Sequence, residues 1–379
     1  MKFLIAPDSF KGSLTAKEAA IAIATGLKRV YPQADYEVVP MADGGEGTVQ
    51  SLVDATGGKI MTANVHQPLG EIVRAEYGLL GNSKTAVIEM AAASGIQYIN
   101  EETRNPLLTS TYGTGELIRA ALDQNVDQII IGLGGSATVD GGAGMAQALG
   151  ARLLSSAGQE IQPGGGGLAD LDHIDITALD SRLQQTKIII ASDVTNPLTG
   201  KSGAATVFGP QKGATARMIA QLDQNLHHFA MIVNRDLGRN LEFTPGSGAA
   251  GGLGFGLLAL TNAEMRQGIE IVTEYSHLAE KAVGSDYVFT GEGGMDFQTK
   301  FGKTPYGVAK VAKKVVPTAP VIALTGKIGH GAASLYEEGF IDAIFSTPNG
   351  AKSLTQAIRE AKADVALVAE NIARLIKMQ

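Results

Sequence analysis

Residues 2–20 read KFLIAPDSFKGSLTAKEAA, and this stretch contains one complete strand–loop–helix unit. The short apolar run at 2–7 is typical of a buried parallel strand. Thr15 is followed three residues later by Glu18, a capping box that predicts the start of a helix. An aspartate, serines and a lysine lie on the loop between them. The stretch therefore predicts an α/β fold whose first strand-to-helix loop carries polar groups.

The alternation of strand and helix recurs at both ends of the chain. Residues 36–41 and 47–56 have the patterns of a second strand and helix, and from residue 285 onward three more strands each precede a helix. Right-handed crossovers join such strands into one parallel sheet, here expected in flavodoxin-like order. We therefore expect a discontinuous α/β domain formed by residues 1–60 and 285–379.

The middle of the chain, residues 61–284, has a different pattern. It begins with consecutive strand-like runs joined by short turns with Gly and Asn, which indicate antiparallel pairing. Alternating strands and helices then resume. We expect a second α/β domain inserted into the first, with the ligand site in the cleft between the two domains.

Composition excludes several classes of protein. The net charge is −7 and no block of Lys and Arg occurs, so a nucleic-acid partner is not expected. The chain has no Cys, which excludes disulfides and cysteine nucleophiles. No apolar run approaches the ~20 residues that span a bilayer, and the N-terminus lacks the pattern of a signal peptide. We expect a cytoplasmic protein without membrane contact, either a monomer or a homodimer.

Six glycine-rich polar loops follow strands or open helices. In α/β sheets, ligands bind outside the carboxyl ends of the strands, where most of these loops are expected. Glycines expose backbone N–H groups that suit anions such as phosphate. The loops cover residues 7–13, 41–48, 132–144, 192–200, 208–214 and 290–305.

The acidic residues of these loops have both local and chemical interpretations. Asp193, Asp8 and Asp43 each follow a predicted strand, where a carboxylate would face a ligand. Aspartate also favours such turns for local reasons, so both interpretations stay open. Glu292 and Asp296 flank a Gly-Gly pair, a spacing that suits Mg²⁺ with oxygen ligands but also fits a solvated loop.

The lysines and glycine motifs of the chain do not by themselves identify a nucleotide-binding site. Lys212 and Lys303 lie on loops and either neutralise phosphates or are simply exposed. A Walker A loop is absent, because Ile328 stands where the GK motif requires Ser or Thr. The glycine-rich run at 251–256 lacks a preceding strand, which disfavours a dinucleotide site, and a dehydrogenase remains a minor alternative. The residues indicate a two-domain, anion-binding α/β protein without naming a reaction.

These same loops resemble the bacterial glycerate kinase family, of the type that makes 2-phosphoglycerate. The matching segments run in order from end to end and include IAPDSFKGSLTAKEAA, VPMADGGEGTV, IIIGLGGSATVDGGAGMAQALGA, SDVTNPLTG and FGPQKGA. The resemblance implies phosphorylation of D-glycerate with ATP and Mg²⁺, by two α/β domains with the site between them. Phosphorylation of the 3-hydroxyl, a related hydroxy acid as substrate, and a non-catalytic ligand sensor stay open as alternatives.

Two positions depart from the family pattern. Gly294 stands where the family usually has arginine, so if that arginine steadies a phosphate, this protein must use another cation or lose some rate. Val139 stands where the family usually has asparagine, which puts a side-chain contact at that position in doubt.

The resemblance also implies roles for individual residues. Asp193 is the expected base that accepts the proton of the substrate hydroxyl, with Asp8 as its rival, and Lys11 is counted with them as catalytic. The other expected roles are binding of substrate by Ser9, Lys11, Asp43 and Ser136, binding of the ATP phosphates by Gly134, Gly135, Gly141, Gly142, Lys212 and Lys303, and binding of Mg²⁺ by Glu292 and Asp296.

Overall fold

The computed structural model describes residues 1–378. Contacts within the chain divide it into two compact units. Unit 1 combines Met1–Gly57 with the residues from Gln267 onward, and unit 2 is formed by Gly58–Arg266. Both units are α/β, which confirms the fold class expected from the sequence. Among the helices within residues 1–378, none combines the length and apolarity that a bilayer crossing requires.

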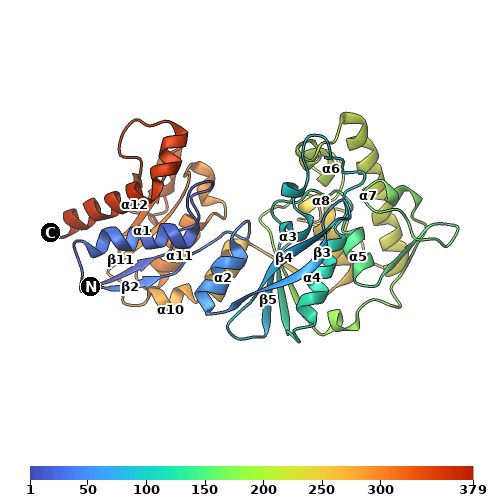
Figure 1. Ribbon diagram of the computed structural model, residues 1–379, viewed down its shortest axis with the longest axis horizontal. Helices are drawn as coiled ribbons and strands as arrows, with labels where there is room; N and C mark the ends of the chain where they lie inside the picture. The colour runs from blue at the N-terminus through green and yellow to red at the C-terminus, as the bar shows by residue number, and fades with distance from the viewer. Residues whose placement is uncertain (379) are drawn as a thin grey trace. The chain divides into compact units, whose positions relative to one another are not determined.

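A five-stranded parallel sheet forms the centre of unit 1. Its strand order is β13-β12-β11-β1-β2, the flavodoxin-like order expected from the sequence. Phe3 pairs with Tyr36 on one side and with Tyr287 on the other, so strands from the two ends of the chain are neighbours (Figure 1). The strands are β1 (Lys2–Ile5), β2 (Asp35–Val38), β11 (Tyr287–Glu292), β12 (Val321–Thr325) and β13 (Ala343–Ser346).

Helix α1 (Ala16–Lys28) begins at the capping box expected from the sequence. Thr15 Oγ1 accepts a hydrogen bond from the Glu18 N–H at 3.2 Å. In return, Glu18 Oε2 accepts one from the Thr15 N–H at 2.9 Å. Two N–H groups that would lack helical partners are thereby satisfied, which fixes where the helix starts.

The first and last helices of the chain pack together in unit 1 (Figure 1). Buried side chains of α1 and of α12 (Leu354–Ile376) share one apolar core. At Gly26 the helices approach so closely that a Cβ atom would lie 2.1 Å from the Ala366 carbonyl oxygen. The remaining helical elements of this unit are α2 (Thr48–Thr56), α9 (Gly268–Tyr275), α10 (Leu278–Ala282), α11 (Thr304–Val315) and the 3₁₀ turns η5 (Phe297–Lys300) and η6 (Ala332–Tyr336).

The chain returns to unit 1 earlier than the sequence pattern suggested. The boundary lies between residues 266 and 267, whereas the pattern placed it at 284/285. Helix α9 packs against α2 and α11, and α10 packs against α9 and α11, all of which belong to unit 1. At the start of α9, a Cβ atom on Gly268 would lie 1.8 Å from the Asp43 carbonyl oxygen. Contacts between segments distant in sequence therefore set this boundary.

A six-stranded mixed sheet forms the centre of unit 2, in the order β10-β9-β6-β5-β4-β3. The strands expected to pair in antiparallel fashion, β3, β4 and β5, do so. Strands β5, β6, β9 and β10 are parallel. The strands are β3 (Lys59–His66), β4 (Ile72–Leu79), β5 (Thr85–Glu89), β6 (Gln128–Gly132), β9 (Lys187–Ala191) and β10 (Glu264–Arg266), with β7 (Arg152–Leu154) and β8 (His173–Asp175) forming a separate antiparallel pair.

The central strands of unit 2 are covered on both faces. The isoleucines at 129–131 and 188–190 are all fully buried, as expected for parallel strands between two helical layers. The helical elements are α3 (Ala91–Ser94), α4 (Tyr112–Leu122), α5 (Ala143–Ala148), α6 (Ala204–Phe208), α7 (Ala216–Leu237), α8 (Ala249–Leu260) and the 3₁₀ turns η1 (Ile96–Tyr98), η2 (Gly167–Asp170), η3 (Ser181–Gln184) and η4 (Pro210–Lys212).

The glycines at the start of α8 serve packing. Ala250, Gly251 and Gly252 have left-handed backbone angles that kink the helix. A Cβ atom on Gly251 would lie 1.8 Å from the Thr138 carbonyl oxygen, and one on Gly252 would lie 2.8 Å from Gly141 Cα. The glycine-rich run therefore lets α8 approach the loop after β6. This close packing explains the glycines without a nucleotide site.

Candidate active site

Three acidic residues lie at the carboxyl edge of the unit 1 sheet. Asp8, Asp43 and Glu292 follow or end β1, β2 and β11, which are neighbours in the sheet. Burial is the largest cause of the raised pKa at both Asp8 and Glu292. The neighbouring negative charge of Asp43 raises both pKa values further. The topology thus gathers the acids that the sequence left on separate loops.

Asp8 has a buried carboxyl group that accepts two hydrogen bonds, one of them from Thr304 at the start of α11. Its Oδ2 accepts a 2.5 Å hydrogen bond from Thr304 Oγ1, and its Oδ1 accepts one of 2.5 Å from the Ser9 N–H. Burial raises the pKa of Asp8 to about 6, although both hydrogen bonds act in the opposite direction. A carboxyl group that titrates near neutral pH is suited to proton transfer.

Glu292 ends β11, and its side chain is 14% exposed. Its Oε1 lies 3.7 Å from Lys303 Nζ and accepts a 3.0 Å hydrogen bond from Thr299 Oγ1. Burial raises the pKa of Glu292 to about 7, while Lys303 and Thr299 act in the opposite direction. The expected phosphate ligand Lys303 therefore pairs with the expected metal ligand Glu292.

The backbone of Asp296 and the side chain of Glu292 are linked by the hydroxyl of Thr299. The Asp296 N–H donates to Thr299 Oγ1 at 3.2 Å, and the same hydroxyl donates to Glu292. Asp296 Oδ1 accepts a 2.9 Å hydrogen bond from the Gln298 N–H and so caps η5. One of its carboxylate oxygens therefore has a structural role.

The carboxylates of Glu292 and Asp296 fit Mg²⁺ as part of a coordination shell that water and phosphate complete. Within residues 1–378, no group of three or more His, Cys, Asp or Glu side chains is arranged to hold a metal ion. Mg²⁺ commonly uses one or two carboxylates and completes its octahedron with water and substrate phosphates. The carboxylates of Glu292 and Asp296 are ligands of that kind.

The loop after β1 places the two remaining expected residues of unit 1 differently. Ser9 is half-buried, and its backbone contacts Asp8. Lys11 is exposed, and its backbone nitrogen would lie 3.1 Å from a Cβ atom on Gly293. This loop and the loop after β11 therefore run close together.

The two departures from the family pattern have different surroundings. Gly294 is exposed, and the nearest atom to a Cβ there would be the Lys327 carbonyl oxygen at 4.0 Å, so a longer side chain has room. Val139 is fully buried in the apolar core of unit 2, together with Leu226 and Phe229. Position 139 is therefore part of the core.

In unit 2, the loop after β6 carries the expected phosphate-binding glycines. Gly134 and Gly135 are exposed. Gly135 has a φ of +74°, a conformation that favours glycine, and its carbonyl oxygen accepts a 2.8 Å hydrogen bond from the Ile96 N–H. Ser136, in contrast, is only 7% exposed. The exposed part of this loop is thus limited to its glycine pair.

Gly141 and Gly142, at the far end of this loop, are buried, and their N–H groups are already bonded. The Gly141 N–H donates to the Gly251 carbonyl oxygen at 3.1 Å, and the Gly142 N–H donates to Asp140 Oδ1 at 3.1 Å. Both glycines have positive φ. Packing and turn geometry give a local reason for these two glycines, and both of their N–H groups are engaged within the protein.

Lys212 was expected to meet phosphates, but its side chain is buried. Only 1% of the residue is exposed. Its Nζ donates hydrogen bonds of 2.6 Å to Ser136 Oγ and 2.7 Å to the Thr138 carbonyl oxygen. Burial lowers its pKa to about 7, while the negative charge of Asp140 acts in the opposite direction. Lys212 therefore binds the loop itself.

Asp193 is exposed two residues beyond the end of β9, at the carboxyl edge of the unit 2 sheet. The strand-end position expected from the sequence is thus observed. Loops after β6 and β9, which are neighbouring strands, bring the glycine pair and Asp193 to the same edge.

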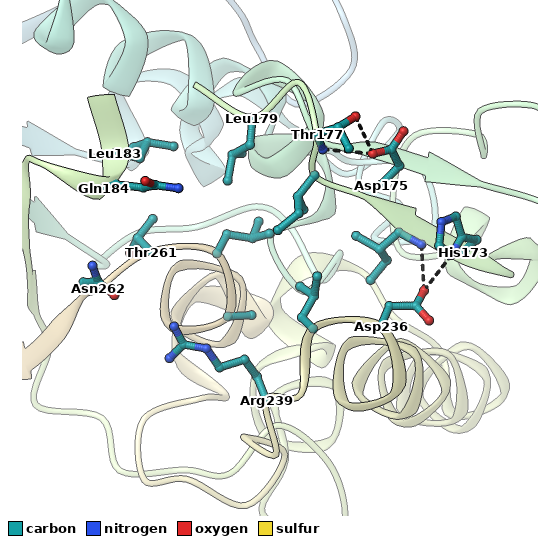
Figure 2. A pocket seen from close by; sticks show the side chains of 15 residues that line it. His173, Asp175, Thr177, Leu179, Leu183, Gln184, Asp236, Arg239, Thr261 and Asn262 are labelled. Atoms are coloured by element: carbon teal, nitrogen blue, oxygen red, sulfur yellow. Dashed lines mark hydrogen bonds and ion pairs between the residues drawn. The ribbon is translucent and has the colours of Figure 1, made fainter. Parts of the chain in front are cut away.

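A pocket within unit 2 lies at the other edge of its sheet. It has a volume of about 800 Å³. Leu183 and Gln184, which precede β9, and Thr261 and Asn262, which precede β10, line it (Figure 2). None of the expected site residues is part of its lining.

Several polar residues of these loops were not singled out from the sequence. Thr304 and Thr299 contact the acids of unit 1, and Thr111 contacts Asp140 in unit 2. Asp140 precedes two glycines at a helix start, a pattern typical of an Asx turn that would have flagged it. The threonines give no comparable signal: Thr304 and Thr111 contact their partners across separate segments of the chain, and Thr299 contacts Glu292 from seven residues further along the same loop.

Comparison with known proteins identifies the family. The model of the "Glycerate kinase family" matches residues 3–377. A glycerate kinase of Bacillus subtilis is 54% identical over 378 residues, covering 100% of this chain and 98% of that protein. A glycerate 2-kinase of Escherichia coli is 49% identical over 373 residues, covering 98% and 97%.

A solved structure agrees with these matches. A crystal structure from Salmonella typhimurium LT2, provisionally described as glycerate kinase 2, has a TM-score of 0.90 and 49% identity. The match covers 100% of this chain and 98% of that one. With a family match over nearly its whole length, the chain belongs to the glycerate kinase family and is an enzyme of that family.

Proposed function

We propose that this enzyme transfers the γ-phosphoryl group of ATP to the 2-hydroxyl of D-glycerate, giving 2-phosphoglycerate and ADP. Family membership over residues 3–377 is the observation that carries the choice of substrate and reaction. The 49% identity to a glycerate 2-kinase supports the 2-hydroxyl as the acceptor. In this reaction the hydroxyl oxygen bonds to the γ-phosphorus, the bond from that phosphorus to the β–γ bridging oxygen breaks, and a base takes the hydroxyl proton.

Unit 1 supplies acids and cations for this chemistry. Glu292 and Asp296 would hold Mg²⁺, which when bound offsets charge on the phosphate oxygens. Lys303, 3.7 Å from Glu292 Oε1, would add a positive charge beside them. Ser9, Lys11 and Asp43 lie on the loops after β1 and β2 and would bind glycerate.

Unit 2 supplies a loop for anionic groups. Gly134 and Gly135 are exposed at the carboxyl edge of its sheet, where backbone N–H groups can bind phosphate oxygens. Ser136 follows them with its hydroxyl held by Lys212. We place phosphate binding on the glycine pair, since the N–H groups of Gly141 and Gly142 are bonded within the protein.

The base is one of two carboxylates. Asp193 remains the first candidate, because it is exposed at a strand end. Asp8 is the second, and its pKa of about 6 suits a base that works near neutral pH. The isosteric variants D193N and D8N distinguish them: loss of the base should lower kcat about 10²- to 10⁴-fold. If D193N keeps a near-normal kcat, the assignment passes to Asp8.

A direct assay tests the proposed activity. Purified protein is incubated with D-glycerate, ATP and Mg²⁺, and ADP formation is followed in a coupled reaction. Parallel reactions omit glycerate, omit Mg²⁺ or replace D-glycerate with L-glycerate. We expect ADP formation only with D-glycerate and a divalent cation. Activity on L-glycerate alone, or without any divalent ion, would contradict the proposal, as would the absence of turnover.

A further inference from the structure

Two buried ionisable side chains form hydrogen bonds that hold the loop after β6 and the start of α5, residues 134–144. Lys212 contacts its first half, and Asp140 forms part of its second half. Both residues are at most 1% exposed. Burying an ionisable group costs free energy unless hydrogen bonds or an opposite charge offset the lost contact with water. The hydrogen bonds of each group therefore show which part of the fold it stabilises.

Lys212 reaches this loop from more than 60 residues away in sequence, since it is the last residue of η4, just after α6. Its two hydrogen bonds, to Ser136 Oγ and to the Thr138 carbonyl oxygen, hold a side chain and a backbone group two residues apart. The exposed glycine pair lies immediately before Ser136. Lys212 thus bonds the residue that directly follows the glycine pair.

Asp140 fixes the other half of the loop with four hydrogen bonds. Its Oδ2 accepts 2.8 Å bonds from both the N–H and the hydroxyl of Thr111, and a 3.2 Å bond from the Gly144 N–H. Its Oδ1 accepts a 3.1 Å bond from the Gly142 N–H. The carboxylate therefore joins the start of α4 to the start of α5.

We propose that Lys212 and Asp140 are positioning residues, which hold the loop at 134–144 in the shape that presents Gly134, Gly135 and Ser136 to the anionic ligand. This inference rests on the proposed function, since it assigns that loop to phosphate or carboxylate binding. Neither residue needs to touch the ligand. A lysine that is 1% exposed with its ammonium group bonded to the loop acts through the loop.

Hydrogen–deuterium exchange of the resting protein tests the positioning role without reference to activity. We expect K212M to exchange the amides of residues 132–144 about ten-fold faster than the wild type, because a loop that loses its contacts opens more often. In kinetic assays the same variant should raise the KM for ATP or glycerate about ten-fold, with a smaller effect on kcat.

A matched control and a second variant keep the test decisive. Lys313 also donates to a backbone carbonyl, that of Ala319 at 3.0 Å, but it lies on α11 of unit 1. K313M should leave exchange at residues 132–144 unchanged. If K212M does not fold, S136A removes only one contact of Lys212 and should still speed exchange there. Unchanged exchange in a folded K212M or S136A, with or without loss of kcat, would overturn the proposal.

The two proposals can fail separately. If the wild-type protein does not phosphorylate glycerate, the proposed function fails, while the exchange experiment still reports whether Lys212 holds the loop. If the wild-type protein is active and K212M lowers kcat alone with normal exchange, Lys212 acts on the ligand directly and the positioning role is wrong.

Discussion

The hydroxyl of Thr304 donates a 2.5 Å hydrogen bond to Asp8 Oδ2, joining the first residue of α11 to the acid that follows β1. Thr304 is fully buried, and Asp8 is 9% exposed. Nearly 300 residues of sequence separate the two partners. The contact therefore exists only because both ends of the chain build one sheet, and it stabilises the ionised form of a carboxyl group that burial would otherwise neutralise.

Replacement of Thr304 by valine tests whether the charge of Asp8 matters for turnover. T304V keeps the shape of the side chain but removes the hydrogen bond that lowers the pKa of Asp8, so this pKa should rise above about 6. We expect the acid limb of the kcat/KM–pH profile to move to higher pH. T304S, which keeps the hydroxyl, should follow the wild type. Superimposable profiles for T304V and the wild type would show that Asp8 has no ionisation-dependent role.

Gly294 offers a gain-of-function test. The position is exposed and open, so G294R can restore the arginine that is usual in the family. If that arginine binds a phosphate, kcat/KM for ATP should rise about ten-fold to a hundred-fold, since a hydrogen bond to a charged group contributes about 1.5–3 kcal/mol. G294Q has a similar length without the charge and should give no comparable gain. A gain in both variants, or in neither, would argue against a phosphate contact.

The packing of the two chain ends can be measured by unfolding. At Gly26 an added Cβ would lie 2.1 Å from the Ala366 carbonyl oxygen, so G26A must push α1 away from α12. We expect a loss of about 1–3 kcal/mol in the free energy of unfolding, measured in urea. The neighbouring exposed residue gives the control: T25A should change this free energy by less than about 0.5 kcal/mol. Equal effects of the two variants would contradict the observed packing.

An ion cluster before and within α12 predicts part of the acid sensitivity. Lys352 Nζ lies 2.5 Å from Asp364 Oδ2 and 2.9 Å from Glu360 Oε2. Hydrogen bonds from Lys352, and then from Arg359 and Gln356, lower the pKa of Glu360 from 4.5 to about 2.

The sign of the effect follows from that lowered pKa. Ionised Glu360 stabilises the folded state fully above pH 4.5, and this stabilisation is lost as the pH falls toward 2. We therefore expect E360Q to have a lower free energy of unfolding in urea than the wild type at pH 6. The difference between the two free energies should narrow as the pH falls below 4.5. E101Q, at an exposed position in unit 2, is the control: its free energy of unfolding should change with pH in the same way as that of the wild type. A gap that is constant with pH would contradict the prediction.

Local signals in the sequence were enough for most of the fold. The capping box at Thr15 and Glu18 is formed as expected, because its partners are only three residues apart. The flavodoxin-like order follows from five strands with helical crossovers, since handedness leaves few topologies. The start of α9 was assigned to the wrong side of the domain boundary, because its contact between Gly268 and Asp43 has no local signature.

The candidate site was less accessible to sequence reasoning. Loop position located Asp8, Asp43 and Glu292 at one sheet edge, since strand ends in a parallel sheet share an edge. The burial of Lys212 could not be read from the sequence, because a lysine on a polar loop is usually exposed. Its partners Ser136 and Thr138 lie on another loop, and only the folded chain brings them together.

The identity of the product tests the proposed reaction most directly. The purified protein is incubated with D-glycerate and Mg-ATP, and the phosphorylated product is identified by phosphorus NMR against authentic 2- and 3-phosphoglycerate. We expect 2-phosphoglycerate to form together with ADP in equal amounts. Formation of 3-phosphoglycerate would contradict phosphorylation of the 2-hydroxyl, and the absence of any phosphoglycerate would contradict the proposed activity as a whole.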